Sequence, residues 1–134
     1  MIVVDTNIIA YLLLPSGHRD SARAALRKDP AWRAPVLWRS EFCNVLALMM
    51  RHKGLRIGDA LDLMERAQRL LGLAEYRVSP AQVLDLAAQS GCTAYDCEFV
   101  ALARELGVSL VTADKAVLKA FPAVALSPKA FVSI

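Results

Sequence analysis

Two short apolar runs constrain the fold of this chain more than any other feature. They are Ile2–Val4 and Val108–Val111, rich in β-branched side chains and followed at once or shortly after by acids, Asp5 and Asp114. Runs of this length and composition are typical of strands that are covered on both faces, as in a parallel sheet. Helical periodicity fills the sequence between them. This alternation predicts an α/β fold, with helices on both sides of a small, mostly parallel sheet.

Helical spacing of apolar residues recurs five times between these strands, and glycines mark the ends of three of the helices. The predicted helices are Arg19–Lys28, Trp38 to Lys53, Ile57–Leu71, Ser79 to Ser90 and Tyr95–Leu106. The spacing places Ile57 and Leu61 on the inner face of the third helix, and Leu84 on that of the fourth. A last short strand is predicted near Val124–Leu126.

Composition narrows the class of protein. A chain of 134 residues fits one domain, residues 1–134, and a hydrophobic fraction of 56% with 22% charged residues excludes a disordered chain. No apolar run reaches the roughly 18–20 residues of a membrane span, and no basic segment precedes the first acid as in a signal peptide. We therefore expect a cytoplasmic protein without a membrane segment. The net charge of +3 is compatible with nucleic acid.

The positions of four acidic residues are the most informative feature for function. Asp5 ends the first predicted strand and Asp114 follows the second, while Glu41 and Asp96 lie near the starts of predicted helices, on their apolar faces. Strand carboxyl ends and helix N-termini gather along one edge of an open parallel sheet, where sites form. The four acids are therefore predicted to converge there.

Such a cluster has a definite electrostatic requirement. Two carboxylates about 5 Å apart repel by roughly 3 kcal/mol at an effective dielectric near 20. A helix N-terminus offsets only about 0.3–1 kcal/mol of this. Four ionised acids therefore need cations or proton uptake, and ligands that are all oxygen favour Mg²⁺ or Mn²⁺. These ions commonly act on phosphodiesters, where they polarise the phosphoryl oxygen and generate hydroxide from water.

Each acid also has a simpler, structural interpretation. A single Asp at a helix start is more often an N-cap than a metal ligand, and Asp114 could cap a helix that begins at Lys115. Asp5 alone could be a turn residue at a strand end. Glu41 is harder to explain in this way, because an acid on an apolar helix face costs free energy unless it has a partner. Taken together, the four positions favour a metal site.

Four segments of the chain carry a family resemblance. They are Met1–Asn7 with Ile8-Ile9-Ala10, Ser40-Glu41-Phe42 with Val45-Leu46, Tyr95–Ala103, and Leu110–Asp114. In this order and at these spacings the sequence resembles the PIN-domain family, and most closely the VapC-type toxins of bacterial toxin–antitoxin pairs. The resemblance covers nearly the whole chain. It implies a PIN-like three-layer α/β/α fold.

The resemblance also implies a metal-dependent endoribonuclease. Asp5, Glu41, Asp96 and Asp114 would form an acidic tetrad that holds Mg²⁺ or Mn²⁺, with Asn7 and Thr112 supporting the same site. Hydrolysis of RNA would leave a 5′-phosphate and a 3′-hydroxyl. The expected partners are the RNA substrate, a small VapB-like antitoxin and a second copy of the chain in a homodimer.

Two other functions remain possible on the residues alone. One is a PIN-like RNA-binding or RNA-processing domain that is not a toxin. The other is a receiver-like signalling switch, although such a switch wants paired acids at the first strand's end, where Asp5 stands alone. The RNA target cannot be inferred from the sequence, because pocket shape and RNA structure decide it.

Two surface features have open interpretations. Arg19, Arg23 and Arg27 recur every four residues, which fits either a solvated helix face or a stripe that contacts phosphates. Four apolar residues lie off the main inner faces of their helices. We expect them to form an exposed patch that binds a partner helix, and the alternative is that they complete the core of the monomer. These residues are Leu48, Met50, Leu63 and Leu70.

Overall fold

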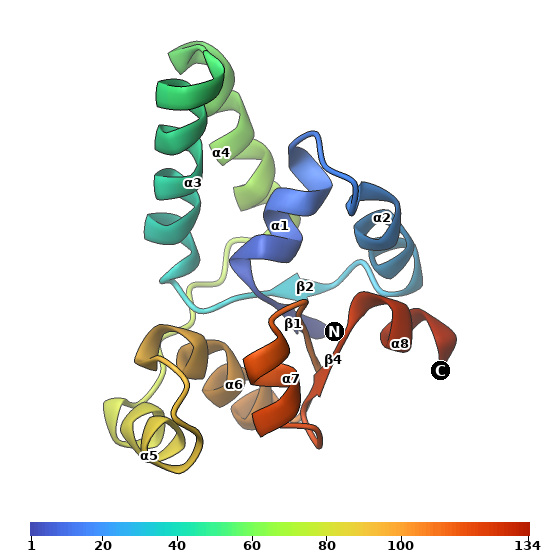
Figure 1. Cartoon of the computed structure of the whole chain (residues 1–134), viewed down its shortest axis with the longest axis vertical. Coiled ribbons are helices and arrows are strands. Elements are labelled where there is room, and N and C mark those ends of the chain that lie inside the picture. The colour runs from blue at the N-terminus through green and yellow to red at the C-terminus, as the bar shows by residue number, and fades with distance from the viewer.

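The computed structural model describes all 134 residues, and strands alternate with helices along the chain (Figure 1). The strands are β1 (Ile2–Val4), β2 (Trp32–Arg33), β3 (Leu110–Val111) and β4 (Ala125–Leu126). The helices are α1 (Thr6–Leu13), α2 (Arg19–Lys28), α3 (Trp38–Lys53), α4 (Ile57–Leu71), α5 (Pro80–Ser90), α6 (Ala94–Leu106), α7 (Lys115–Ala120) and α8 (Pro128–Ser133).

The four strands form one parallel sheet in the order β2-β1-β3-β4. In the register between the two central strands, Val3 pairs with Leu110 and Val4 with Val111. All carboxyl ends therefore meet at one edge of the sheet. Val3, Val4 and Val111 are fully buried, as expected for strands that are covered on both faces. The predicted α/β class and the parallel sheet are confirmed.

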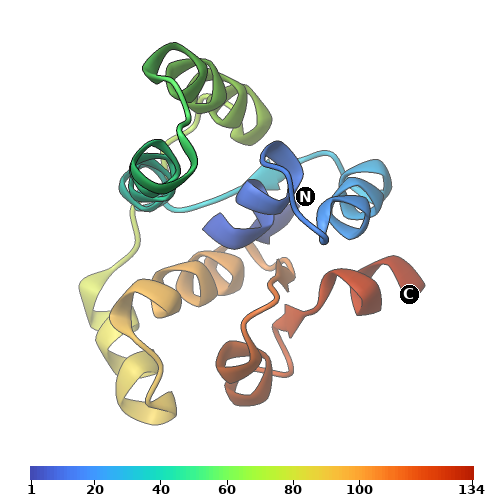
Figure 2. The ribbon, with the colours of Figure 1, turned by 45° about the horizontal axis from the view of Figure 1, so that its top comes forward.

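Helices cover both faces of the sheet, which gives three layers (Figure 2). Helices α1 and α2 lie on one face, and α6 and α7 lie on the other. Helix α5 packs on the outside of α6, and α8 packs against α2 and β4. Helices α3 and α4 form an antiparallel pair that projects from the body of the molecule (Figure 1). The predicted three-layer α/β/α architecture is confirmed.

Most predicted elements have nearly the predicted bounds. Gly54 and Gly107 end α3 and α6 with φ of 68° and 67°, a left-handed conformation that glycine adopts without a Cβ penalty. The second predicted strand is shorter than expected, because only Leu110 and Val111 of it pair with β1. Helix α1, helix α8 and strand β2 were not predicted. Strand β2 has only two residues and carries no periodicity of its own.

Two predicted helix faces are wrong in part, although Leu71 of α4 and Val83 of α5 are buried as predicted. In α4, Ile57 and Leu61 are 61% and 60% exposed, and the buried stripe consists of Ala60, Leu63, Ala67 and Leu71. The two small alanines let α4 approach its neighbours closely, and a pattern weighted towards large apolar residues misses them. Of the predicted exposed patch, Leu63 belongs to the core instead, Met50 and Leu70 are partly buried against the core, and only Leu48 is exposed. In α5, Leu84 is 65% exposed, whereas Leu86 is buried.

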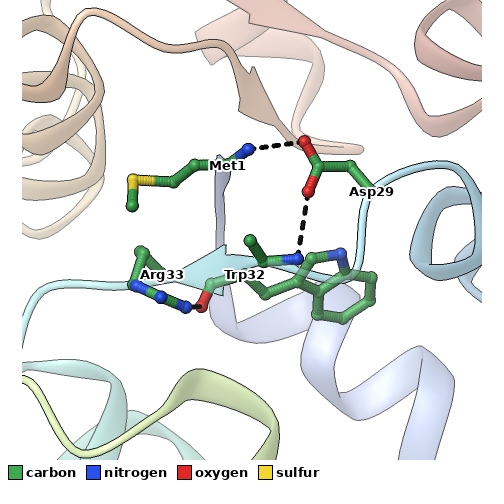
Figure 3. Close-up of polar contacts among 5 residues, drawn as sticks. Met1, Asp29, Trp32 and Arg33 are labelled. Carbon is green, nitrogen blue, oxygen red and sulfur yellow. Dashed lines mark hydrogen bonds and ion pairs between the residues drawn. The ribbon is translucent and has the colours of Figure 1, made fainter.

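The amino ends of β1 and β2 are fixed at the edge of the sheet opposite to the acids (Figure 3). The N-terminal ammonium of Met1 donates to Asp29 Oδ2 at 2.6 Å, and the Ala31 amide donates to Asp29 Oδ1 at 3.0 Å. Arg33 Nη1 donates to the carbonyl of Trp32 at 2.7 Å. Burial raises the pKa of Asp29. The two hydrogen bonds from Met1 and Ala31, together with the charges of the ammonium and Arg33, outweigh this effect and hold the pKa below its usual range.

No helix of this structure has both the length and the apolar character needed to cross a bilayer. Cys43, Cys92 and Cys97 are all free thiols.

Candidate active site

Asp5 is held at the carboxyl end of β1 by two contacts. Its Oδ1 accepts a hydrogen bond from the Ile8 amide at 3.1 Å, so Asp5 is the N-cap of α1. The hydroxyl of Thr112 donates to its Oδ2. This second contact follows from the register, because Val4 pairs with Val111 and the next residues of the two strands are therefore neighbours.

Thr112 also positions Asp114. Its Oγ1 accepts a hydrogen bond from the Asp114 amide at 3.0 Å, and the residue is completely buried. Asp114 Oδ1 in turn accepts from the Val117 amide at 3.0 Å and caps α7. The structural interpretation of Asp114 as a helix cap is therefore correct, and Asp5, interpreted as a turn residue at a strand end, caps the helix α1 that was not predicted. Each carboxylate offers about four lone-pair positions, so capping leaves room for another ligand.

Glu41 lies in the first turn of α3 and has the partner that its place on an apolar helix face requires. The buried Thr6 hydroxyl donates to Glu41 Oε1 at 2.7 Å. Thr6 is the first residue of α1, directly after Asp5. The hydrogen bond therefore ties the start of α3 to the start of α1 and fixes the Glu41 carboxylate beside the carboxyl edge of the sheet.

Asp96 is the third residue of α6 and does not cap this helix itself. Thr93 is the N-cap, and its Oγ1 accepts from the Asp96 amide at 3.1 Å. The Asp96 carboxylate makes no hydrogen bond to a backbone donor, unlike those of Asp5 and Asp114. It therefore has the greatest freedom of the four to bind something else.

All four acids line one cavity of about 230 Å³, which we call the acidic cavity. Asn7 lines it as well, as predicted. Thr112 does not line the cavity and contributes through its hydrogen bond to Asp5. The remaining lining residues are Thr6, Asn44, Val45 and Phe99. The structure thus brings together residues that are as far apart in sequence as Asp5 and Asp114.

The pKa values of three acids show the cost of this convergence. Burial raises the pKa of Asp5 to about 6, against the opposing bonds from Thr112 and Ile8, and the charges of Asp114 and Asp96 add to the rise. Burial also raises the pKa of Glu41, with a further contribution from Asp96. The pKa of Asp96 is raised by burial and by Asp114, and contact with Thr93 partly opposes this. A cation in the cavity would relieve all three effects.

The side chains fit a hydrated divalent ion better than a bare one. No group of three or more His, Cys, Asp or Glu side chains is arranged so that it could hold a metal ion by direct contact alone. Mg²⁺, however, usually keeps several waters and binds through one or two carboxylates. A volume of 230 Å³ has room for such waters, since each takes about 30 Å³. The donors are all oxygen, as Mg²⁺ and Mn²⁺ prefer.

Three polar residues of this region were missed from the sequence. Thr6 directly follows Asp5, and Asn44 lies three residues after Glu41, on the same helix face; these two spacings were the available signals. The third is Glu98, whose pKa is raised by burial and by the charge of Glu41. None of the arginines of the Arg19–Arg27 stripe lines the acidic cavity.

The Thr112 hydroxyl gives a direct test of this geometry. Thr112→Val keeps the shape of the side chain but removes the donor to Asp5 and the acceptor of the Asp114 amide, so we expect a loss of about 1–3 kcal/mol in the free energy of unfolding. The pKa of Asp5 should rise further above 6, since a bond that lowers it is gone. Chemical denaturation and an NMR titration of the carboxyls measure the two effects. Thr112→Ser, which keeps the hydroxyl, is the control; equal effects of both variants would contradict the geometry.

A four-stranded parallel sheet with helices on both faces and acidic residues at its carboxyl edge defines a known class of protein domain. Residues 2–124 match the family model of the PIN domain, and the chain belongs to the PIN-domain family. Membership of this family excludes the receiver-like signalling switch.

Two individual proteins show where the chain stands within this family. It is 30% identical, over 125 residues, to Ribonuclease VapC3 from Pyrobaculum aerophilum, a match that covers 91% of this chain and 95% of that protein. The expected resemblance to VapC-type members is thereby confirmed. The crystal structure of PAE2754 from the same organism superposes with a TM-score of 0.71 at 21% identity, covering 98% of this chain and 93% of that one. The second comparison confirms the fold.

Proposed function

We propose that the protein is a metal-dependent endoribonuclease and the toxin of a type II toxin–antitoxin pair. The observation that carries the proposal is the acidic cavity, where four carboxylates from separate segments meet although burial and mutual repulsion raise the pKa of Asp5 to about 6. A protein retains such an arrangement at a cost in stability when the charges are needed. The similarity to a protein named as a ribonuclease supports RNA as the substrate.

In this proposal Asp5, Glu41, Asp96 and Asp114 hold Mg²⁺ or Mn²⁺. The ion would polarise the phosphoryl oxygen and generate hydroxide from water. The chain's own contribution is orientation: Thr112 and the Ile8 amide fix both oxygens of Asp5, and Thr6 fixes Glu41. Hydrolysis leaves a 5′-phosphate and a 3′-hydroxyl.

Metal removal tests the mechanism. Incubation of the purified protein with EDTA should abolish cleavage of an RNA panel, and added Mg²⁺ or Mn²⁺ should restore it, because the carboxylates alone offer no donor to the transition state. Gel analysis of labelled RNA measures cleavage, and circular dichroism checks that chelation leaves the fold intact. Activity that survives thorough chelation contradicts the metal-dependent mechanism.

We also propose a cytoplasmic homodimer of residues 1–134, one PIN-like domain, which a small VapB-like antitoxin inhibits by covering the acidic cavity. The projecting pair α3 and α4 offers a surface for a partner, since its side chains Leu48, Ile57 and Leu61 are 42–61% exposed. Light scattering tests the dimer: a mass of 14.6 kDa at tens of micromolar contradicts it. Co-expression with the neighbouring small gene tests the toxin role. Growth arrest that no gene of the locus relieves would leave an RNA-processing PIN nuclease, which is the second candidate function.

A further inference from the structure

A second cleft, of about 480 Å³, has the opposite electrostatic character to the acidic cavity and shares the helices α6 and α7 with it. Residues 89–92 at the end of α5, Arg104 of α6, Ala116 and Lys119 of α7, and Phe121 line it, with no acid among them. We call it the basic cleft. The structure has three ion pairs, Met1–Asp29, Arg39–Glu75 and Arg69–Glu65. Arg104 and Lys119 take part in none of them, so neither has a carboxylate within 4 Å.

The same two helices lead from the acidic cavity to the basic cleft. Helix α6 carries Asp96 near its start and Arg104 eight residues later, about 12 Å along the axis at 1.5 Å per residue. Helix α7 is capped by Asp114 and carries Lys119 five residues later, about 7.5 Å further on. Lys115, exposed, lies between these two residues on α7. On α7 the charges beyond Asp114 are thus all cationic, whereas on α6 Arg104 follows both Asp96 and Glu98.

Arg104 is held in place for such a role. Its guanidinium lies 5.8 Å from the centre of the Phe121 ring, a cation–π contact that orients the group without neutralising it. Two carboxylates, Asp85 and Glu105, border a separate cleft together with Arg104, but neither pairs with it. Gln89, also in the basic cleft, already donates its amide to Asp85 at 2.9 Å.

The charge balance of the chain favours a polyanion as the occupant. Four of the 13 acidic residues line the acidic cavity, so nine remain elsewhere against 16 lysine and arginine residues. A polyanionic substrate is repelled by the cavity and needs cations beside it. Resting on the proposed function, we propose that the basic cleft binds the phosphate backbone of single-stranded RNA next to the bond that is cleaved.

Binding without cleavage tests this site. A labelled single-stranded RNA of about 12 nucleotides is titrated with the protein in EDTA at several salt concentrations, followed by fluorescence anisotropy. Arg104→Gln with Lys119→Gln should weaken binding about tenfold, and the slope of log K against log salt should decrease by about 1.4, since each lost phosphate contact removes about 0.7. The control with the same charge change is Arg51→Gln with Lys53→Gln, at the exposed end of α3.

A second measurement uses the natural thiols and needs no substitution. Cys92 lines the basic cleft, whereas Cys43 is exposed on α3. Bound RNA should slow alkylation of Cys92 and leave that of Cys43 unchanged. Equal protection of both thiols, or of neither, contradicts the proposed binding site.

The outcomes also separate this proposal from the ribonuclease function. Wild-type affinity and salt slope in the cleft variant, or an equal loss in the control variant, overturn the basic cleft even if the protein cleaves RNA. If the cleft variant loses binding to an acidic protein segment while its RNA affinity is unchanged, the cleft is assigned to a protein partner. That result overturns the proposed RNA site as well. Binding that depends on the cleft, in a protein that cleaves no RNA, supports the cleft and refutes the nuclease.

Discussion

Asp5→Asn should abolish RNA cleavage and at the same time make the protein more stable at neutral pH. Loss of a carboxylate from the acidic cavity removes several kcal/mol of transition-state stabilisation, which corresponds to a rate loss of about a thousandfold or more. The asparagine oxygen retains the N-cap to Ile8, since Asn caps helices about as well as Asp, and the amide nitrogen that replaces Oδ2 can donate to the Thr112 hydroxyl. The fold is therefore preserved while the buried charge disappears.

The gain in stability depends on pH in a defined direction. The pKa of Asp5 is raised from 3.8 to about 6 by folding, so the folded protein binds the proton more tightly than the unfolded chain. Wild-type stability therefore falls as the pH rises from about 4 to about 6 and is constant above that for this group. The difference from Asp5→Asn should reach at most about 3 kcal/mol above pH 6 and vanish below pH 4.

Urea denaturation at a series of pH values measures this difference, and labelled RNA measures cleavage. Asp62→Asn on the outer face of α4 removes an exposed carboxylate and should change neither quantity. The same loss of cleavage is expected for Glu41→Gln, Asp96→Asn and Asp114→Asn. Loss of activity together with a loss of stability would show that the charge of Asp5 stabilises the fold, and would contradict the expected gain.

A pair of leucines in α5 should respond very differently to the same substitution. Leu86 is 3% exposed and packs in the core, whereas Leu84 is 65% exposed. Leu86→Ala should therefore lower the free energy of unfolding by about 2–5 kcal/mol, through lost burial and the cavity left behind. Leu84→Ala should change it by less than about 0.5 kcal/mol. Because both changes are Leu to Ala within one helix, intrinsic helix propensity cancels in the comparison.

Thermal and urea unfolding of the two variants measure this difference. RNA cleavage by Leu86→Ala at a temperature where the protein is folded serves as a control, since α5 contributes nothing to the acidic cavity. A larger loss of stability in Leu84→Ala than in Leu86→Ala would mean that Leu84, as predicted from the apolar spacing, lies on the buried face of α5, and would contradict the structure.

These leucines show where sequence reasoning succeeded and where it failed. Periodicity located α5 and the buried Val83, but it selected Leu84 in place of Leu86, because these residues satisfy several helical stripes and only packing against α6 selects one. The same happened in α4, where Ala60 and Ala67 carry the buried stripe. Strand β2 could not be predicted from the sequence, because two residues cannot show the alternation of a strand.

The acidic residues were predictable for a different reason. Asp5 and Asp114 follow strands whose unbroken apolar sequences predict a parallel sheet, so their positions at one edge follow from the parallel topology. Glu41 was identified by the cost of an acid on an apolar helix face. Thr6 and Glu98 were missed, because their roles depend on the distance between α1, α3 and α6, which local sequence does not specify.

The pairing of β1 with β3 has a consequence for synthesis of the protein. Strand β1 lies inside the sheet although it is made first, and its neighbour β3 follows more than a hundred residues later. Contacts of such separation form slowly and late in folding. Until Thr112 and Asp114 have left the ribosome, the nascent chain lacks two of the groups that complete the acidic cavity. The acidic cavity therefore stays incomplete until the nascent chain has been extended past Asp114 and this segment has emerged.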